Sequence, residues 1–428
     1  MRICHLSWEY PPVVYGGLGR HVYAVATEQA RAGHDVVVIS HVGIDVEERI
    51  HSSDPTAIED MPESDEMLEG VRVIRVVRDA PHVPFEAETL MGWVAGLSSA
   101  MTRASLASVG EPFDVVHAHD WMTAHSASIV SEAWGVPWVH TIHATEAGRH
   151  QGWLPGRLSE AIHSIEHWSV HNADQVLVCS QHMRWEVERL FAMPNAQVVP
   201  NGVDPGVSEV DETLQTQFRK QFPTPLIVHT GRLEWEKGAH TLVEALPRIR
   251  RKFPDVHLVI AGRGSQIDAL KALAKRKRLT SRVSFLGWLP EDELRALVAA
   301  ADVAAVPSLY EPFGIVALEA ASVGTPVVAA RSGGLTEFLA DDHHGWGFAA
   351  GDAVELAAAV SSCLENPAEA NQRAAAAISH ISTHHGWKKI AHETVRQYQA
   401  CMSSKSRSSK DEYSMRPIAI EGNLLFDV

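Results

Sequence analysis

Two positive side chains lie close together in a short segment near the middle of the chain. Arg232 and Lys237 stand five residues apart in TGRLEWEKG (230–238), at the end of the apolar run PLIVHTGR. Parallel sheets bind ligands at the carboxyl ends of their strands, so both cations are expected at such an edge. A forked guanidinium and a compact ammonium together suit one diphosphate. The alternative is that both are surface charges paired with Glu234 and Glu236.

A second segment, YEPFGIVALEAASVGTPVVAARSGGLTE (310–337), carries two carboxylates. Glu311 precedes a turn and a helix start, where free backbone amides can bind an anion. These amides belong to Gly314, Ile315 and Val316. On one helix Glu311 and Glu319 would lie about 12 Å apart, well beyond the about 5–5.5 Å of a retaining glycosidase pair. They are therefore interpreted as two ligand-binding acids, the alternative being solvated or capping carboxylates.

The first glycine-rich turn of the chain is a third candidate site. Gly16, Gly17 and Gly19 follow the strand pattern RICHLS and precede a helical pattern. Backbone amides in such a turn can approach an anion closely, and the helix that follows favours negative charge. The GxGxxG pattern of dinucleotide-binding proteins is incomplete, because Val22 occupies the third glycine position. A tight turn without a ligand is the alternative.

Short apolar runs alternate with longer helical patterns along the chain, which is typical of βαβ units and parallel sheets. Strands are expected at 2–7, 35–40, 71–77, 114–119, 138–143, 175–180, 225–232, 257–264, 283–289, 303–308 and 325–330. Helices are expected at about 17–32, 90–108, 121–134, 159–172, 239–252, 265–277, 291–300 and 316–323. All three candidate segments then begin where a strand ends.

The domain boundary is expected at VVPNGVDPGVSEVDE, where turn formers and acids interrupt the pattern. An α/β fold follows, with two Rossmann-like doubly wound domains at 1–204 and 205–384 facing each other across a cleft. A helix at 385–401 is expected to pack back on the N-terminal domain, before a flexible tail at 402–428. Residues 42–70 are expected as a long, acidic, exposed loop.

The composition fits two globular domains in one chain of 428 residues. The formal net charge of −16 argues against a nucleic acid or an anionic membrane as a partner, because both need a basic face. The N-terminal apolar stretch stops at Pro11 and Pro12, and no later run reaches the about 18 apolar residues of a membrane span. A cytoplasmic protein without a membrane span is expected.

Cysteine and histidine usage points away from disulfides and metal ions. Four isolated cysteines without a CxxC pair fit a reducing compartment: Cys4, Cys179, Cys363 and Cys401. Among the 25 histidines, His117 and His119 form an HxH pair with no third ligand nearby in the sequence. No convincing metal-binding DxD motif is present either. We therefore expect neither a metal ion nor another cofactor.

Five motifs occur together and in order, and they make the chain similar to a known family. GGLG, HAHDW (117–121), PNGVD (200–204), GRLEWEKG and EPFGIVALE resemble those of the retaining family-4 glycosyltransferases, a GT-B group similar to glycogen and starch synthases. The likeness covers residues 1 to about 400. SWEYPPVVYGGLGRHV and HATEAGRH bring it closest to the actinobacterial α-1,4-glucosyltransferases of methylglucose lipopolysaccharide and glycogen synthesis. It implies transfer of a glucosyl group from UDP-glucose or ADP-glucose to an α-glucan or oligosaccharide.

The resemblance also implies roles for individual residues. Arg232 and Lys237 would hold the donor diphosphate and stabilise the leaving group, while Glu311 would bind hydroxyls of the donor sugar and Glu319 the ribose. The ring of His143 would face the sugar near the reacting carbon, completing a catalytic group of His143, Arg232, Lys237 and Glu311. The donor cradle would add Gly17, Gly314, Ile315 and Val316. The acceptor side would contain Gly16, Asp120, Glu146 and Arg149.

One position departs from the family pattern. Bacterial glycogen synthases that use ADP-glucose carry a lysine two residues before their GG, where this chain has Val14, so the donor base stays open. A GT-B nucleotide-sugar epimerase and a mannosyltransferase are enzyme alternatives. A catalytically silent nucleotide-sugar-binding module and a pyridoxal-dependent glucan phosphorylase are the others. Retention of the anomeric configuration is implied by the resemblance alone.

Overall fold

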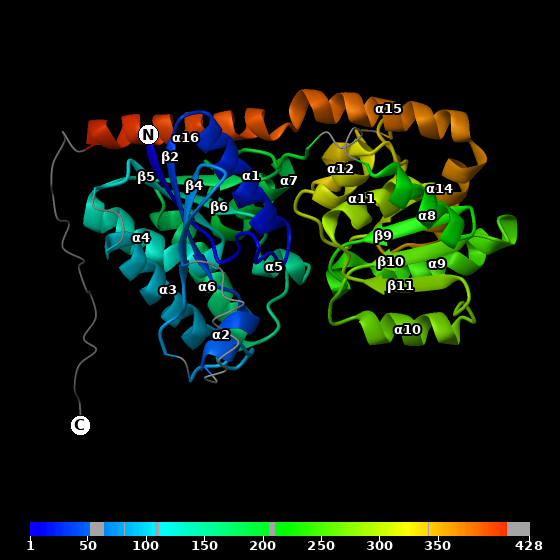
Figure 1. Ribbon diagram of the computed structural model, residues 1–428, viewed down its shortest axis with the longest axis horizontal. Coiled ribbons are helices and arrows are strands. Elements are labelled where there is room, and N and C mark those ends of the chain that lie inside the picture. Colours follow the sequence, from blue (N-terminus) through cyan, green and yellow to red (C-terminus); the bar gives the residue numbers. More distant parts are fainter. Residues whose placement is uncertain (52–63, 81, 108–110, 205–209, 341, 409–428) are drawn as a thin grey trace.

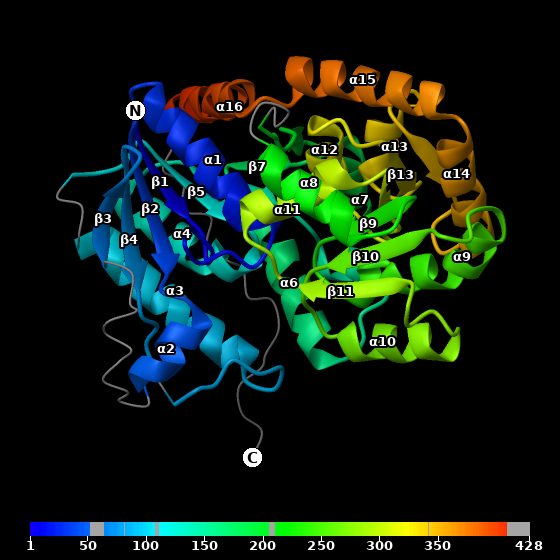
Figure 2. The ribbon, with the colours of Figure 1, turned by 45° about the vertical axis from the view of Figure 1, so that its right-hand side comes forward.

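The computed structural model of this chain describes residues 1–51, 64–80, 82–107, 111–204, 210–340 and 342–408. Its strands form two sheets that stand beside each other, each with helices packed around it (Figures 1 and 2). The chain completes the first sheet before it begins the second. This α/β architecture has the two Rossmann-like domains that the sequence predicts.

The first sheet has eight strands in the order β3-β4-β2-β1-β5-β6-β7-β8. Among its described strands, only β3 runs antiparallel to its neighbour, β4. Its strands are β1 (Arg2–Leu6), β2 (Asp35–His41), β3 (Asp65–Leu68), β4 (Val71–Val76), β5 (Val115–His119), β6 (Trp138–Ile142), β7 (Gln175–Val178) and β8 (Gln197–Val198). Its helices are α1 (Gly17–Arg31), α2 (Ile44–His51), α3 (Leu90–Ala107), α4 (Ala124–Trp134), α5 (Glu146–Arg149), α6 (Arg157–Asn172) and α7 (Gln181–Phe191).

The second sheet has six parallel strands in the order β11-β10-β9-β12-β13-β14. They are β9 (Leu226–Thr230), β10 (His257–Ala261), β11 (Val283–Gly287), β12 (Val303–Val306), β13 (Val327–Ala330) and β14 (Trp346–Phe348). The helices of this half are α8 (Glu212–Gln221), α9 (Ala239–Lys252), α10 (Ile267–Arg276), α11 (Glu291–Ala300), α12 (Ile315–Ser322), α13 (Leu335–Leu339), α14 (Ala353–Glu365) and α15 (Pro367–His384).

Successive residues of the central strands enter different hydrophobic clusters, because side chains alternate between the faces of a sheet. In β2, Val36 and Val38 pack in one cluster, while Val37 and Ile39 pack in another. Both faces of the sheet are therefore buried, as expected for a doubly wound fold. This explains why the parallel strands appear in the sequence as unbroken apolar runs and not as alternating patterns.

The prediction of an exposed loop at 42–70 was wrong for the described part of that segment. Residues 44–51 form α2 and residues 65–68 form the edge strand β3, whereas 52–63 lie outside the described residues. Glu47 is buried, and its carboxylate is 2.7 Å from Arg78 and 3.1 Å from the His41 ring. These partners are distant in sequence, so the local acidic composition gave no sign of the buried helix.

The C-terminal helices cross from the second domain to the first. α15 runs along the C-terminal domain, and α16 (Trp387–Ser408) returns along the N-terminal domain (Figures 1 and 2). α16 packs against α1, and its Trp387, Tyr398 and Cys401 join the hydrophobic cluster of β1 and β2. The helix ends at Ser408 and not at the expected Cys401. The remainder of the expected tail, residues 409–428, lies outside the described residues.

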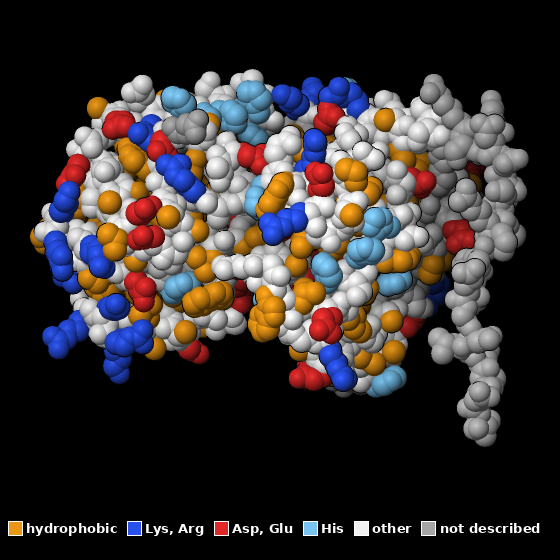
Figure 3. Space-filling view, turned by 180° about the vertical axis from the view of Figure 1, so that it is seen from behind, with side chains coloured by type: hydrophobic (Ala, Val, Ile, Leu, Met, Phe, Trp, Pro, Cys, Tyr) orange, Lys and Arg blue, Asp and Glu red, His pale blue; other side chains and the backbone are white. Residues whose placement is uncertain are grey.

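Charged side chains of both signs are interspersed on the face of the molecule that Figure 3 shows, without one continuous basic area. None of the helices in the described ranges has both the length and the apolar content that a membrane span requires. All four cysteines are buried and free.

Candidate functional site

The predicted site residues meet where the carboxyl edges of the two sheets face each other. The loop after β1 contributes Gly16 and Gly17, and the ends of β9 and β12 lead to Arg232 and Ile315. A Cβ atom added to Gly17 would lie 3.1 Å from Ile315 Cδ1, and one added to Gly16 would lie 4.0 Å from Arg232 Nε. The glycine turn therefore lies directly against the predicted donor site, and a larger residue there would enter it.

The two predicted cations are both paired with carboxylates. Lys237 Nζ lies 2.8 Å from Glu311 Oε2, with only a fifth of the lysine side chain exposed. Arg232 is more open, and its Nη2 lies 3.4 Å from Glu236 Oε1. The surface-charge alternative named Glu236 as a partner, and Arg232 indeed pairs with it. Lys237 reaches instead across the loop to Glu311, so the structure joins two of the predicted catalytic residues.

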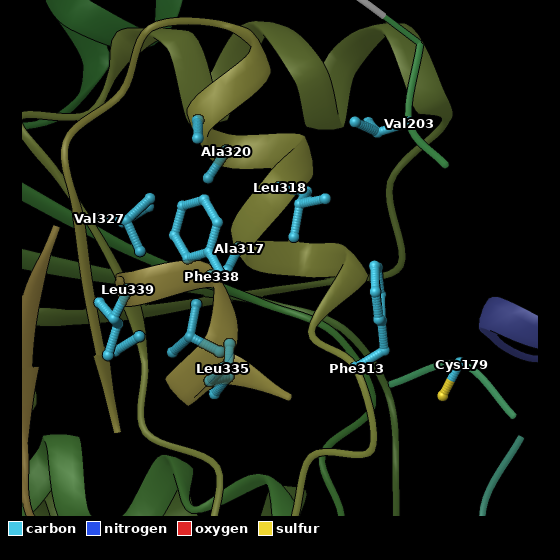
Figure 4. Close-up of a cluster of buried hydrophobic side chains, with 14 of the residues drawn as sticks. Cys179, Val203, Phe313, Ala317, Leu318, Ala320, Val327, Leu335, Phe338 and Leu339 are labelled. Carbon is cyan, nitrogen blue, oxygen red and sulfur yellow. The ribbon is translucent and has the colours of Figure 1, made fainter. Parts of the chain in front are cut away.

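The helix α12 presents its N-terminus to the same place. Its Ile315 and Val316 amides belong to the first turn, which has no intrahelical acceptors for them. Gly314 caps the helix at φ 103°, a left-handed conformation that favours glycine. Figure 4 shows Ala317 and Leu318 of this helix on the buried cluster that includes Phe338 of α13. This packing fixes the direction in which the helix points its free amides.

The second glycine loop, SGGLTE, has a structural role. A Cβ atom on Gly333 would overlap the carbonyl oxygen of Glu311, and one on Gly334 would lie 2.6 Å from the Cα atom of Phe313. Gly334 N donates a hydrogen bond of 2.9 Å to that same Glu311 oxygen. The two glycines therefore let this loop approach the backbone around Glu311 and hold it in position.

Glu319, the predicted ribose ligand, faces the other domain. Its Oε1 lies 2.6 Å from Nη1 of Arg20 on α1. Burial raises the pKa of Glu319, and the Arg20 guanidinium opposes this rise. A cavity of about 280 Å³ adjoins the pair between α1, α11 and α12, and its lining includes Arg20, Thr230, Ile315 and Glu319. The sequence reasoning missed Arg20 because its partner lies in the other domain.

The ring of His143 lies immediately after β6. Its Nε2 is 3.1 Å from His119 Nδ1, and the edge-on ring of His21 lies 4.8 Å away between centroids. Burial lowers the pKa of His143 to about 3, so the ring is neutral near pH 7. It is therefore suited to hydrogen bonding and not to carrying a positive charge.

Asp120 holds the backbone of His143. The His143 N–H donates a 2.7 Å hydrogen bond to Asp120 Oδ1, and burial raises the pKa of this carboxyl to about 6. Asp120 has a φ of 58°, which is uncommon for a residue other than glycine. Such strain is found at functional sites where the surrounding structure enforces it. The structure thus gives Asp120 a positioning contact that the sequence did not indicate.

Glu146 and Arg149, predicted for the acceptor side, begin and end α5. Glu146 accepts a 2.5 Å hydrogen bond from the Ser159 hydroxyl and lies 3.2 Å from the ring of His150. Within the described residues, the Arg149 side chain forms no hydrogen bond or salt bridge. Burial works against its charge, but Asp120 and other acidic neighbours hold the pKa of Arg149 above its usual value.

As expected, no third ligand lies near the HxH pair in the sequence. In the folded structure, however, a third histidine lies beside it. In space, His5 joins His117 and His119, and the ligand atoms of these three residues lie within 4.8 Å of one another. His21, His119 and His143 form a second such group. The close nitrogen pairs between His5, His119 and His143 are spaced as hydrogen bonds, at 3.1 Å each.

A carboxylate that the sequence reasoning missed occupies part of the glycine turn. Glu9 Oε2 accepts hydrogen bonds from the amides of Tyr15, at 2.8 Å, and Gly16, at 2.9 Å. Glu9 is almost fully buried, and burial raises its pKa. The turn thus already has a negative partner of its own. A backbone hydrogen bond from Gly19 also stabilises the Glu9 carboxylate, so the amides of Tyr15, Gly16 and Gly19 are already directed at it. Glu9 lies within the quoted segment SWEYPPVVYGGLGRHV, but its residue type alone did not indicate this contact.

Comparison with known proteins identifies the family. The profile of "Glycosyltransferase Family 4" matches residues 15–207, and that of "Glycosyl transferases group 1" matches residues 211–380. A glycogen synthase of Mycobacterium tuberculosis is 43% identical over 408 residues, covering 94% of this chain and 95% of that protein. The chain belongs to the family-4 glycosyltransferases. The predicted enzyme class, a nucleotide-sugar-dependent hexosyltransferase, is therefore confirmed.

Two further similarities concern this glycosyltransferase. An α-maltose-1-phosphate synthase of Mycolicibacterium smegmatis is 28% identical, covering 93% of this chain and 99% of that protein. The solved structure of a sucrose-phosphate synthase from Thermosynechococcus elongatus superposes with a TM-score of 0.79 at 24% identity, covering 94% of this chain and 99% of that one. The latter likeness concerns the fold alone, and it confirms the predicted GT-B architecture.

Proposed function

We propose that this glycosyltransferase moves a glucosyl group from UDP-glucose or ADP-glucose onto the end of an α-glucan or oligosaccharide, forming an α-1,4 bond with retention. The observation that carries this proposal is the meeting of Arg232, Lys237 and the α12 N-terminus at one place, against the glycine turn of the other domain. Two cations and a helix N-terminus provide a strong site for a diphosphate. The 43% identity to a glycogen synthase supports the choice of glucose and glucan.

The Lys237–Glu311 pair supplies both halves of the donor site. A diphosphate entering beside the α12 N-terminus attracts the Lys237 ammonium, which releases the Glu311 carboxylate to accept hydrogen bonds from sugar hydroxyls. As the bond between the anomeric carbon and the diphosphate breaks, its electrons go to the diphosphate, and Arg232 and Lys237 stabilise that growing charge. The acceptor hydroxyl oxygen forms the new bond to the same carbon, and the proton of that hydroxyl goes to the diphosphate oxygen that leaves.

Glu319 binds the ribose in this proposal. Arg20 holds its Oε1 atom, so Oε2 is the oxygen that faces the ribose hydroxyls. Because this contact lies far from the reacting carbon, it contributes to donor affinity and not to the rate of the chemical step.

The acceptor binds beside Gly16, Asp120, Glu146 and Arg149. One observation favours a second class of acceptor, a sugar phosphate. Within the described residues Arg149 is an arginine without a salt bridge, and a guanidinium pairs well with phosphate. The similarity to an α-maltose-1-phosphate synthase supports including this class in the test.

The proposal is tested by incubating the purified protein with UDP-glucose, ADP-glucose, GDP-glucose and GDP-mannose. Each donor is combined with maltooligosaccharides, with glucose 1-phosphate or with no acceptor. We expect a glucose-extended product with a new α-1,4 bond, identified by mass spectrometry and proton NMR. Sugar transfer from GDP-mannose, and from none of the other three donors, would favour the mannosyltransferase. Conversion of the donor's sugar to its epimer in the absence of an acceptor would favour the epimerase.

A cytoplasmic location is part of the same proposal. The four buried, free cysteines support it, because secreted proteins tend to pair their cysteines. Fractionation of the native cells with an antibody against this chain tests the location.

A further inference from the structure

A chain of hydrogen-bonded side chains leads from the interior of the N-terminal domain to His143. It begins at Gln29 on α1, whose Oε1 lies 2.8 Å from His5 Nε2. His5 Nδ1 lies 3.1 Å from His119 Nε2, and His119 Nδ1 lies 3.1 Å from His143 Nε2. Gln29, His5 and His119 are completely buried, so no solvent competes for these contacts.

The sheet topology brings these rings together. β1 pairs with β5 so that His5 stands opposite His117, and His119 follows two residues later on the same face. β6 pairs with β5 on its other side, placing His119 opposite Thr141. His143 then follows Thr141 by two residues. Three adjacent parallel strands thus place histidines close together at one edge: His5 near the end of β1, His119 at the end of β5 and His143 just after β6.

Every imidazole ring in this series of hydrogen-bonded side chains is neutral near pH 7. Burial lowers the pKa of His5 to about 4 and that of His143 to about 3, and it lowers the pKa of His119 well below its usual value. A neutral imidazole carries one proton, so one of its nitrogens donates and the other accepts. In a chain of such rings, the direction of the first hydrogen bond therefore sets the direction of all the others.

Gln29 sets that direction. Its oxygen faces His5 and can only accept, while its Nε2 lies 3.3 Å from the Tyr398 hydroxyl. The Tyr398 hydroxyl lies 2.6 Å from His117 Nδ1 and can donate to it, and His117 Nε2 lies 2.7 Å from the Thr141 hydroxyl. All of these contacts are satisfied when the amide oxygen of Gln29 accepts from His5 and its amide nitrogen donates to Tyr398.

This direction decides which nitrogen of His143, the last ring of the series, carries the proton. His5 then carries its proton on Nε2, and so do His119 and His143, which leaves the lone pair of His143 on Nδ1. Within the described residues, His143 Nδ1 makes no hydrogen bond, and it is not one of the buried unpaired atoms, so it is open to solvent. The edge of the His21 ring packs against His143 and restricts its rotation.

We propose that Gln29, acting through His5 and His119, is a positioning residue that fixes the Nε2–H tautomer of His143. Nδ1 is thereby presented as a hydrogen-bond acceptor for a hydroxyl of the bound sugar. The proposal rests on the proposed function in one respect, that His143 faces the donor sugar. The tautomer itself can be measured without any substrate.

The test is nitrogen-15 NMR of the full-length protein labelled at histidine, with His143→Asn used to assign the signals of His143. We expect the wild-type His143 ring to be protonated at Nε2. In Gln29→Met, which keeps the side-chain length but removes the acceptor, we expect a mixture of both tautomers. Ser98→Ala is the matched control: it removes a buried hydrogen bond of the same domain, between the hydroxyls of Ser98 and Ser126, and should leave His143 protonated at Nε2.

Measuring turnover tests the role of His143 in sugar transfer separately from the proposed tautomer. We expect Gln29→Met to reduce turnover about tenfold at saturating donor, as when a partner that orients a histidine is lost. A changed tautomer with unchanged turnover would support the hydrogen-bond chain and contradict the role of His143 in transfer. A wild-type ring protonated at Nδ1, or a Gln29→Met ring still entirely in the Nε2–H form, would overturn the proposal. The wild-type measurement decides even if Gln29→Met does not fold.

Discussion

Lys237 and Glu311 illustrate what residue types can and cannot reveal. The spacing of Arg232 and Lys237 in a glycine-flanked loop predicted a cationic site, and Glu311 was predicted as a separate sugar ligand. The structure places Lys237 on Glu311 at 2.8 Å. That pairing depends on the approach of the β9 and β12 loops, which no local pattern encodes. Arg20 was missed for the same reason, since it acts through Glu319, a contact distant in sequence. Glu9 contacts the nearby amides of Tyr15 and Gly16, and it was missed because a single carboxylate beside a turn is not specific.

The cations should matter to the rate of transfer. In a chain with a net charge of −16, Arg232 and Lys237 are two cations beside α12: Arg232 follows Gly231, where an added Cβ would lie 3.9 Å from Val316 Cγ2, and Lys237 pairs with Glu311. Lys237→Ala and Arg232→Ala should each slow turnover by about 10²–10³, the usual effect of deleting one preorganised charge-stabilising group. Turnover is measured at saturating donor, and Arg251→Ala on the exposed face of α9 serves as the control. Wild-type turnover in folded variants would place the donor site on another loop.

Glu319→Ala is the informative comparison for these variants. If Glu319 binds the ribose, its loss removes an interaction present in both the ground and transition states, which raises KM for the donor and leaves turnover nearly intact. Arg20→Ala should raise the same KM less, because Glu319 remains but loses the contact that orients it. A fall in turnover equal to that of Lys237→Ala would contradict the ribose assignment.

His143→Ala should affect the chemical step more than nucleotide binding. The neutral ring faces the sugar in our proposal, so turnover should fall by about 10²-fold or more. The affinity for the nucleoside diphosphate, measured by calorimetry, should change little. An unchanged turnover would mean that His143 only fills space among its buried neighbours.

At the scale of elements, alternation of apolar runs and helical patterns was sufficient for most of the fold. The central strands and the helices predicted between them lie where the sequence predicts them, within a few residues at their ends, because both faces of each sheet are buried. The structure adds helices that the sequence analysis did not predict, among them α7, α8 and α14. Other elements that were not predicted lie at the edges of the first and second sheets. β3 and β14 are short, and α2 is held by the buried Glu47–Arg78 pair, so none of them carries a strong local pattern.

The glycine turn before α1 gives a prediction at this scale. A side chain on Gly17 would meet Ile315 at the start of α12, so Gly17→Val should push the two elements apart. We expect a higher KM for the donor and lower turnover, with the melting temperature nearly unchanged because the turn is at the surface of the cleft. Gly92→Val on α3 is the control, since a Cβ there meets only Val83, at 3.4 Å. Normal kinetics in Gly17→Val would contradict the close approach.

At the scale of the whole molecule, buried histidines should make the protein sensitive to acid. Burial lowers the pKa of six imidazoles at the edge of the first sheet: His5, His21, His117, His119, His140 and His143. The folded state therefore binds their protons more weakly than the unfolded state does. Their contribution to stability is complete above pH 6.5 and is lost as pH falls toward 4.

Several carboxyls act in the opposite sense. Burial raises the pKa of Asp120 to about 6 and that of Glu166 to about 8, so their contribution is lost as pH rises through those values. Burial raises the pKa of Glu9 and of Glu319 as well, and these two carboxyls act in the same sense. Because the histidines outnumber them, the urea midpoint should be lower at about pH 5 than near pH 7. His140→Phe replaces a buried ring that has no hydrogen-bond partner in the described part of the chain, and it should show a smaller difference. Equal midpoints for the wild-type protein would contradict these pKa shifts.

In our proposal, the donor residues of the C-terminal domain face the acceptor residues of the N-terminal domain. The central claim is that a sugar leaves its nucleotide only to join an acceptor. The most direct test is the ratio of new α-1,4 bonds, from proton NMR, to nucleoside diphosphate released. We predict a ratio of one with a maltooligosaccharide or glucose 1-phosphate present, and almost no release without an acceptor. Equal release with and without an acceptor, and no new bond, would contradict the account.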